Sequence, residues 1–324
     1  MQFPRRHFLK LAGAAAAAPA LPRLATALDY PTRPVRFIVP LAPGGGLDFV
    51  ARLTSEYMSR AIGQQFYIEN KLGAGGMIGI ETAAKSPPDG YSVLITNDNV
   101  ASAPHVLRLN VDYLKDLLPV SLLGRQPQAL AVHPSFEVNS VAELVAAVKK
   151  VPSMSCATSG VGSNQHVLME WFAKEADIRL EHVPYRGAGQ AINDLLAGHV
   201  KIAFLGPTAL LPHAAAKSVR ILAQSGDTRS RSMPDVPTLQ EAGFKGLSLE
   251  SWYGTFAPLG TPPAVTARLN AETDKALKDP AMKEALAKGA TEGVGGAAEL
   301  LAKLAREDSE KYARIVKEVN IKLG

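Results

Sequence analysis

Three consecutive glycines follow an apolar run and precede a helical pattern near the start of the chain. The run Val35–Val39 ends at Pro40, and Gly44, Gly45 and Gly46 come shortly after it. From residue 50 onward, apolar residues recur at one-turn spacing. The first turn of a helix has unpaired backbone N–H groups and about half a unit of positive charge. Since glycine lets a ligand reach that backbone, the stretch predicts an anion site, and a βα turn without a ligand is the alternative.

The same order of elements recurs in the second half of the chain. Residues 154–158 form a β-prone run, residues 159–163 read Ser-Gly-Val-Gly-Ser, and a helical pattern with an apolar face follows. We expect Ser163 to be the N-cap of that helix. In open α/β sheets, ligands bind beyond the carboxyl ends of the strands. Both glycine loops lie at such ends.

Three acidic or amide residues beside the first loop raise a question of charge. A carboxylate at Asp48 that lay about 6 Å from an anionic ligand would cost about 3 kcal/mol at an effective dielectric of 20. We therefore expect Asp48 to cap its own helix and point away, and contact with a cationic or hydroxyl group of the ligand is the alternative. Asp98 and Asn99 follow the strand at residues 91–96. We expect them to be solvated loop residues, with recognition of a ligand amine or hydroxyl as the alternative.

The first 27 residues have the pattern of an export signal. Arg5 and Arg6 precede an apolar run that is too short to span a bilayer, and residues 25–27 read Ala-Thr-Ala, a small-x-small cleavage site. Paired arginines followed by Phe-Leu-Lys are typical of twin-arginine signals, and an ordinary secretory signal is the alternative. The mature chain is expected to begin at Leu28 in the periplasm, with no transmembrane segment and no cysteine near the cleavage site for a lipid anchor.

Composition and spacing exclude several classes of function. The sequence has 35 Lys+Arg against 30 Asp+Glu, and removal of the signal takes four basic residues and no acids, which leaves 31 against 30 over 297 residues. A nearly neutral chain gives no reason to propose nucleic acid as a partner. Cys156 is the only cysteine, so no intrachain disulfide can form. No metal-ligand spacing and no nucleotide-binding glycine motif occurs, so we expect no metal and no cofactor.

Strands and helices alternate along nearly the whole mature chain. Apolar runs such as residues 91–96, 154–158 and 201–205 are followed by helical patterns, and Ser140 with Glu143 forms a capping-box signature. The pattern predicts an α/β fold with parallel sheets covered by helices on both faces. The length allows one large domain or two ordinary ones.

Six motifs, taken in order, carry a family likeness over essentially the whole mature chain. They are Pro43-Gly-Gly-Gly-Leu-Asp48, Glu69-Asn-Lys-Leu-Gly-Ala-Gly-Gly76, Pro88-Asp-Gly-Tyr91, Ser159-Gly-Val-Gly-Ser163, His182-Val-Pro-Tyr-Arg-Gly187 and Met233-Pro-Asp-Val-Pro-Thr238. With these motifs the chain resembles the Bug-type solute-binding receptors of tripartite tricarboxylate transporters. Their number and order carry the resemblance more than any single motif.

The resemblance implies a two-domain periplasmic binding protein fold, type II-like, with two parallel-rich sheets and a ligand cleft between the domains. The first domain would comprise residues 28–126 and 226–324, and the second residues 127–225, with crossings near Arg125 and Ser225. The two glycine loops would face each other across the cleft and hold the carboxylate of a small organic acid. The receptor would be a monomer that delivers its ligand to the membrane permease of the transporter.

The expected ligand-binding residues come from the two glycine loops and from the strand ends beside them. They are Leu41, Ala42, Gly44, Gly45, Gly46, Asp48, Asn97, Asp98, Asn99, Ser159, Val161, Gly162, Ser163, Asn164, His166, Tyr185, Leu205 and Gly206. Tyr185 could stack on the ligand, donate a hydrogen bond to it, or lie at the rim. If Leu205 lines the cleft, the pocket favours an aromatic or branched acid; if Leu205 is buried core, nothing follows from it.

Two other functions compete with the receptor interpretation. A Ser/His hydrolase would use Ser163 and His166, but Gly-x-Ser-x-Gly is absent and Ser163 is the expected helix cap. Cys156 lies within an apolar strand, which indicates a core residue. We therefore expect no enzyme. The same fold could also pass its ligand to a membrane sensor, and the sequence does not separate this output from transport.

Overall fold

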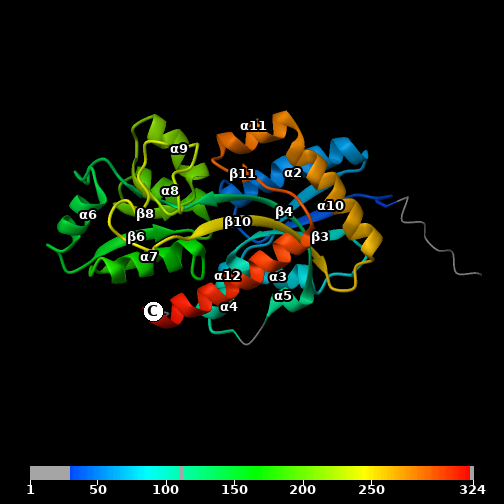
Figure 1. Ribbon diagram of the computed structural model, residues 1–324, viewed down its shortest axis with the longest axis horizontal. Coiled ribbons are helices and arrows are strands. Elements are labelled where there is room, and N and C mark those ends of the chain that lie inside the picture. The colour runs from blue at the N-terminus through cyan, green and yellow to red at the C-terminus, as the bar shows by residue number, and fades with distance from the viewer. Residues whose placement is uncertain (1–29, 110–111, 322–324) are drawn as a thin grey trace, which may run out of the picture. The chain divides into compact units, whose positions relative to one another are not determined.

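Two β-sheets, each covered by helices, organise the computed structural model, which describes residues 30–109 and 112–321 (Figure 1). The described residues from Pro31 onward form one compact unit that contains both sheets. Each sheet with its helices is called a lobe below. The predicted export signal at residues 1–27 lies outside the described residues.

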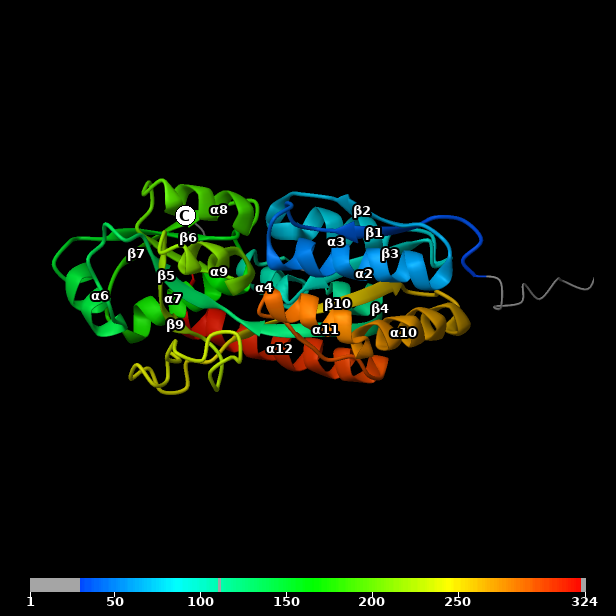
Figure 2. The same ribbon diagram turned by 90° about the horizontal axis from the view of Figure 1, so that it is seen from above.

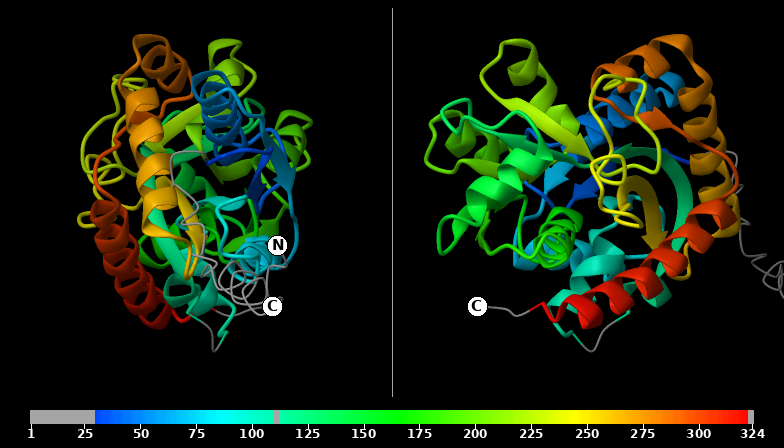
Figure 3. Two further views of the ribbon diagram at one scale, coloured as in Figure 1. Left: turned by 90° about the vertical axis from the view of Figure 1, so that its right-hand side faces the viewer. Right: turned by 60° about the vertical axis from the view of Figure 1, so that its left-hand side comes forward.

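The first sheet is mixed and belongs to the first lobe. Its strand order is β11-β4-β10-β3-β1-β2. Strand β1 pairs in parallel with β2 and β3, whereas β10 pairs antiparallel with β3 and β4, and β11 pairs antiparallel with β4. The long strands β4 and β10 curve side by side (Figure 3). The strands are β1 Val35–Val39, β2 Phe66–Asn70, β3 Ser92–Asn97, β4 Leu117–Pro127, β10 Glu250–Pro258 and β11 Glu292–Gly293.

The second sheet is also mixed and has the order β7-β6-β8-β5-β9. Strand β6 pairs in parallel with β7 and β8, and β5 pairs antiparallel with β8 and β9. The two-sheet α/β fold is confirmed, but the strands next to the crossings run antiparallel to their neighbours, so the sheets are less parallel than expected. The strands are β5 Ala129–Val132, β6 Met154–Thr158, β7 Leu180–Pro184, β8 Ile202–Leu205 and β9 Arg220–Gln224.

Helices follow most of the strands, and α12 extends over both lobes. It packs on β4 and α4 of the first lobe and reaches α7 of the second (Figure 2). The helices of the first lobe are α2 Gly46–Ile62, η1 Ala74–Gly76, α3 Met77–Ala84, α4 Asn99–Val106, α5 Tyr113–Asp116, α10 Pro263–Lys278, α11 Pro280–Lys288 and α12 Ala298–Val319. Those of the second lobe are α6 Val141–Val148, α7 Asn164–Glu175, α8 Ala188–Leu196 and α9 Pro207–Ala215.

The two crossings between the sheets are hydrogen-bonded to each other. The chain passes from β4 to β5 through Gln128 and leaves β9 through Ser225. The N–H of Gln128 donates to Ser225 Oγ at 2.8 Å, and the N–H of Ser225 donates to the Gln128 carbonyl at 2.9 Å. Both residues are fully buried. The crossings therefore act as one two-stranded connection.

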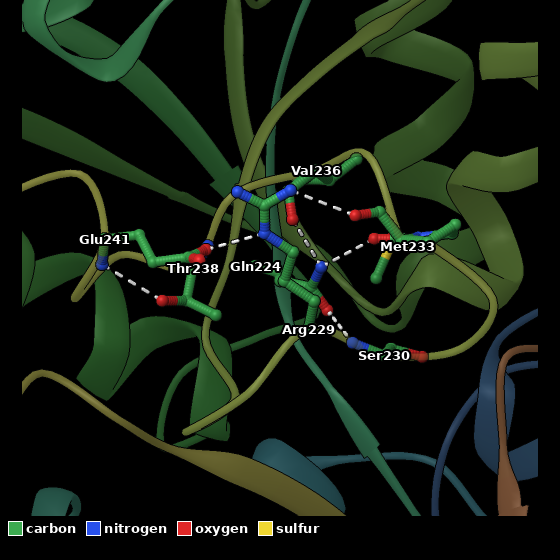
Figure 4. A network of polar contacts seen from close by, with 8 residues as sticks. Gln224, Arg229, Ser230, Met233, Val236, Thr238 and Glu241 are labelled. Carbon is green, nitrogen blue, oxygen red and sulfur yellow. Dashed lines mark hydrogen bonds and ion pairs between the residues drawn. The ribbon is translucent and has the colours of Figure 1, made fainter.

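A single buried amide holds the segment after β9 against the second sheet (Figure 4). Gln224 Nε2 donates to the carbonyl oxygens of Met233 at 2.9 Å and Val236 at 2.7 Å. Its Oε1 accepts from the N–H of Ser230 at 2.8 Å. Three of the amide's hydrogen-bonding positions are thus satisfied by one loop, which fixes the path of that loop.

The same segment contains a reciprocal cap. Glu241 N–H donates to Thr238 Oγ1 at 3.0 Å, Thr238 N–H donates to Glu241 Oε2 at 2.7 Å, and Arg229 Nε pairs with that carboxylate at 2.8 Å. Thr238 also forms a parallel bridge with Gln224 at the end of β9. The expected division assigned residues 226–324 to the first domain, and these contacts place residues 233–239 beside the second sheet. We propose that, after the crossing at Ser225, the chain passes along the second sheet before it joins the first sheet at Glu250, where β10 begins.

The apolar core continues from one lobe into the other. One cluster of buried side chains includes Ile38 of β1, Leu122 of β4, Leu130 of β5 and Phe172 of α7. A second cluster lies within the second lobe and contains Leu205 of β8 and Leu195 of α8. The lobes are therefore joined by packing as well as by the two crossings.

Gly162 lies where the lobes are in close contact, and an alanine there should destabilise the fold. Its φ is +80°, and an added Cβ would lie 2.8 Å from Ala103 Cβ of α4. We expect Gly162→Ala to reduce the free energy of unfolding by roughly 2–4 kcal/mol, measured by urea denaturation. Gly63→Ala is the matched control, because Gly63 has φ +76° and no atoms within 4 Å of an added Cβ. An equal decrease in the free energy of unfolding in both variants would contradict the prediction, because it would show that Ala103 can move aside without destabilising the fold.

Candidate ligand-binding site

The N-terminus of α2 is built by the first glycine loop as the sequence predicted. Gly45 is the N-cap with an extended backbone, φ −99° and ψ 174°. Asp48 Oδ2 accepts the N–H of Gly44 at 3.2 Å and the Nε–H of Arg52 at 2.8 Å. Oδ1 of Asp48 accepts from Arg52 Nη2 at 2.9 Å and from Asn70 Nδ2 at 3.2 Å. Asp48 lies in the first turn of α2 and accepts a backbone N–H of the preceding loop, but Gly45 and not Asp48 is the N-cap. Its charge is paired with Arg52.

The N-terminus of α8 adjoins that of α2, and the two backbones are nearly in contact (Figure 2). The Ala42 N–H donates to the Arg186 carbonyl at 3.2 Å. A Cβ added to Gly187 would lie 3.2 Å from Ala42 Cβ, and one added to Gly189 would lie 2.7 Å from the Pro43 carbonyl oxygen. Gly187 has φ +150°, which glycine adopts without strain. The expected partner of the first loop was instead the loop at residues 159–163.

A small cavity, called the inner chamber below, lies between these helix starts. Its volume is about 30 Å³. Among the residues that the structure describes, no Lys, Arg or His side chain lines it, and Asp48 is the one charged residue in its lining. The lining residues are Leu41, Ala42, Gly45, Gly46, Leu47, Asp48, Asn97, Gln126, Ser159, Gln165, Gly187, Ala188, Gly206, Ser251 and Tyr253.

Two short chains of hydrogen bonds orient the polar side chains of the inner chamber. Ser159 Oγ donates to Gln165 Oε1 at 2.7 Å, and Gln165 Nε2 donates to Gln128 Oε1 at 2.6 Å. On the opposite side, Gln126 Nε2 donates to the hydroxyl of Tyr253. Burial raises the pKa of Tyr253, so its hydroxyl stays neutral. The chamber therefore offers neutral donors held in place by their own partners.

A larger opening, called the outer cleft below, lies between the lobes and shares Leu41 and Ser159 with the inner chamber. Its volume is about 610 Å³. Of the predicted residues, Val161 and Tyr185 line this cleft and not the chamber. The Tyr185 hydroxyl donates to Asp194 Oδ2 at 2.6 Å, and burial together with that carboxylate raises the pKa of Tyr185 to about 12. Its hydroxyl is thus already used within the second lobe.

Asp98 lies in a buried network that joins the lobes, so the expectation of a solvated loop residue was wrong. Its side chain is fully buried. Oδ2 accepts from Asn164 Nδ2 of α7 at 2.8 Å and from the Tyr312 hydroxyl of α12, and Oδ1 accepts from Ser251 Oγ of β10. Asn99 is also buried, and its Nδ2 donates to the Gly75 carbonyl at 3.3 Å.

The second glycine loop uses its polar groups internally. Ser163 is the N-cap of α7 as predicted: its Oγ accepts the His166 N–H at 3.2 Å and donates to the Gly160 carbonyl at 2.7 Å. The Gly162 N–H donates to His166 Nδ1 at 3.3 Å. None of Gly162, Ser163 and His166 lines the inner chamber. This loop therefore contributes Ser159 and a lobe contact, and α8 occupies the position that sequence reasoning gave to α7.

The remaining expected residues divide between the chamber and the core. Asn97 and Gly206 line the inner chamber, whereas Gly44 and Asn164 do not. Leu205 is fully buried in the core of the second lobe, so nothing about the ligand follows from it. Of the chamber lining, sequence reasoning missed Leu47, Gln126, Gln165, Gly187, Ala188, Ser251 and Tyr253. The signal for Gly187 was present, because β7 followed by Tyr-Arg-Gly and a helix repeats the strand, glycine, helix order.

The residues proposed for a hydrolase do not form a nucleophile and base pair. Among the described residues, no hydrogen bond joins the side chains of Ser163 and His166. Burial and the stacked ring of His166 lower the pKa of His182 to about 3, which makes it a weak base. Cys156 is buried in β6, and burial raises the pKa of its thiol. The geometry gives no support to hydrolysis.

Residues 50–321 match the family described as the tripartite tricarboxylate transporter family receptor, and residues 2–22 match the twin-arginine translocation pathway signal sequence. The chain belongs to this receptor family. The resemblance seen in its motifs is thereby confirmed. The family consists of binding receptors, so the protein is a receptor and not an enzyme, and its signal directs export to the periplasm.

Two curated relatives of the receptor are similar over nearly their full length. It is 36% identical over 315 residues to the UPF0065 protein in the tcbD-tcbE intergenic region of a Pseudomonas species, covering 96% of this chain and 94% of that protein. It is 34% identical over 302 residues to protein BugT of Bordetella pertussis, covering 91% of each.

Three solved structures share the fold of the receptor. The periplasmic binding protein BugD has a TM-score of 0.86 at 30% identity, covering 90% of this chain and 99% of that one. An R. palustris protein with adipate has a TM-score of 0.86 at 29% identity, with the same coverage. MatC from Rhodopseudomonas palustris with bound malate has a TM-score of 0.85 at 29% identity, covering 89% and 100%.

The described part of the receptor lacks two features, a membrane-spanning helix and a cluster of metal ligands. Over residues 30–109 and 112–321, none of the helices combines the length and the apolar character needed to cross a membrane. Within the same residues, no group of three or more His, Cys, Asp and Glu side chains could hold a metal ion.

The buried carboxylate of Asp98 should make stability depend on pH. Burial raises its pKa from 3.8 to about 6, although bonds from Ser251, Tyr312 and Asn164 oppose the shift. A raised folded-state pKa contributes stability that is present below pH 3.8 and is lost as the pH rises through 6. Asp98→Asn cannot ionise; its amide oxygen can accept from Asn164 and Tyr312, and its amide nitrogen can donate to the Ser251 hydroxyl, which reverses the direction of that bond. The free energy of unfolding of the variant minus that of the parent should therefore increase by on the order of 3 kcal/mol from pH 4 to pH 7.

Urea denaturation at several pH values measures this difference. Asp177→Asn is the control, because the Asp177 side chain is 98% exposed and its substitution should leave the pH dependence unchanged. A difference between Asp98→Asn and the parent that is constant from pH 4 to 7 would contradict the prediction.

Proposed function

We propose that the receptor binds a small organic acid by placing one carboxylate in the inner chamber, and delivers it to a tripartite tricarboxylate-type permease. The observation that carries the proposal is the convergence of two helix N-termini, α2 and α8, from different lobes on one chamber. Helix N-termini favour anions because their N–H groups are unpaired and the helix dipole is positive there. The lining holds no cation that could replace this interaction.

The magnitudes explain why one helix start is insufficient. A charge-assisted hydrogen bond contributes about 1.5–3 kcal/mol, and a helix terminus adds roughly 0.3–1 kcal/mol, or about 2 when partly buried. Micromolar binding requires about 8 kcal/mol after association costs of at least about 4 kcal/mol. One exposed loop falls short of that sum. Two helix starts together with the amides of Gln126 and Gln165 in a closed chamber supply enough donors.

Asp48 does not oppose this assignment. Its carboxylate lines the chamber, but Arg52 pairs with both of its oxygens, at 2.8 and 2.9 Å. The ion pair reduces the repulsion that an isolated Asp48 would exert on a ligand anion. Asp48 also fixes Gly44 in the loop through the Gly44 N–H.

Two similar structures support the ligand class. The R. palustris structure contains adipate and MatC contains malate, and both share the fold over nearly their whole length. Delivery to a permease is supported by the family description alone. Hinge opening about the paired crossings at Gln128 and Ser225 would admit the ligand, and closure would bring the helix starts together.

Charge on the ligand should decide binding. A thermal-shift screen of mono-, di- and tricarboxylates, including adipate and malate, should find an acid that raises the melting temperature by about 5 °C at a hundredfold excess over its Kd. The amide or methyl ester of that acid should give no shift, because helix N-termini prefer an anion. Equal shifts from the acid and its neutral derivative would count against the carboxylate site.

Gly46 should be essential for binding and Gly45 should not. A Cβ on Gly46 would overlap the Tyr253 hydroxyl and lie 2.8 Å from Gln126 Nε2, whereas a Cβ on Gly45 would make an ordinary contact of 3.5 Å with Ala188 Cβ. We expect Gly46→Ala to weaken binding of the best acid by roughly tenfold or more, and Gly45→Ala by less than about threefold, in titration calorimetry. Similar affinities in both variants would refute the placement of the site.

A further inference from the structure

The outer cleft differs in chemistry from the inner chamber. The first lobe contributes Pro40, Leu41 and Leu72 to it, and the second lobe contributes Val161 and Pro184. No Asp, Glu, Asn, Gln or His side chain lines the cleft among the described residues. Most side chains in the walls of the cleft are therefore apolar, and its polar side chains are Ser159, Tyr185 and Arg186.

The two cavities form successive parts of one site. They share Leu41 and Ser159 in their linings. The inner chamber, at about 30 Å³, is far smaller than the outer cleft. It can accept only a terminal group, so the rest of any ligand must lie in the outer cleft, whose volume of about 610 Å³ is typical of ligand pockets.

The polar side chains at the edge of the cleft are not placed to hold a second charged group firmly. The Tyr185 hydroxyl is bonded to Asp194 at 2.6 Å. Arg186 lines the cleft but is exposed, so water screens its charge. Arg186 can attract anions toward the opening, while the body of the ligand meets apolar surface.

We propose, on the basis of the carboxylate function above, that the ligand is a carboxylate with an apolar body, aromatic or branched aliphatic. The carboxylate enters the inner chamber, and the apolar body occupies the outer cleft between Leu72 and Val161. Hydroxylated polycarboxylates are disfavoured, because their additional polar groups would lose water in the cleft without gaining partners.

Titration calorimetry with three probes tests the proposal on the full mature chain. The probes are phenylacetate, malate and the neutral phenylacetamide. We expect phenylacetate to bind roughly tenfold or more tightly than malate, and phenylacetamide not to bind. Malate binding as tightly as phenylacetate, or phenylacetate failing to bind, would overturn the apolar class. If phenylacetate fails to bind but malate binds, the proposed carboxylate function still holds. If phenylacetamide binds as tightly as phenylacetate, the carboxylate function itself is overturned.

Two substitutions locate the apolar body. Leu72→Ser and Val161→Thr should each lower the affinity for phenylacetate by about fivefold or more and leave malate affinity unchanged or raised. The matched controls are Leu259→Ser and Val151→Thr, which change exposed apolar residues, 58% and 45% exposed, outside the cleft. Thermal melting of all four variants checks the fold. If Leu72→Ser and Val161→Thr fold but keep the parent's ratio of phenylacetate affinity to malate affinity, the placement of the apolar body in the outer cleft would be overturned.

Discussion

The backbones of the two lobes come together where α8 begins, and the rest of the site depends on that approach. The Ala42 N–H bonds to the Arg186 carbonyl, and Gly187 and Gly189 have no room for a side chain against Ala42 and Pro43. This contact sets the N-termini of α2 and α8 around one small chamber. Among the described residues, the lining of this chamber holds no Lys, Arg or His, and its polar side chains apart from Asp48 are neutral amides and hydroxyls.

The two lobes are held together by two kinds of contact, backbone contacts of glycines and hydrogen bonds of buried side chains. Near the chamber they are made by glycine backbones, and beneath it they are made by the buried side chains around Asp98. An apolar core continues from β1 through β4 and β5 to α7, and α12 packs on both lobes. The carboxylate of Asp98 is costly to bury, so the network that surrounds it resists rearrangement only while its donors remain in place.

Local signals in the sequence predicted the loops correctly, and long-range pairing decided what they face. The glycines at 44–46, the capping role of Ser163 and the two-sheet α/β fold followed from periodicity, capping chemistry and motif order. The partner of the first loop did not, because nothing local distinguishes the start of α7 from that of α8. Asp98 was placed in solvent for a similar reason: its burial arises from Asn164, Ser251 and Tyr312, which are 66 to 214 positions away.

The solitary cysteine gives the receptor a practical property. Cys156 has no exposed surface in β6, and burial keeps its thiol protonated, so the nucleophilic thiolate is scarce in the folded chain. A maleimide dye would therefore react with a cysteine introduced at an exposed position such as that of Leu72 and leave the native thiol untouched. The receptor can thus carry a fluorescent reporter of lobe movement without prior removal of its own sulfhydryl group.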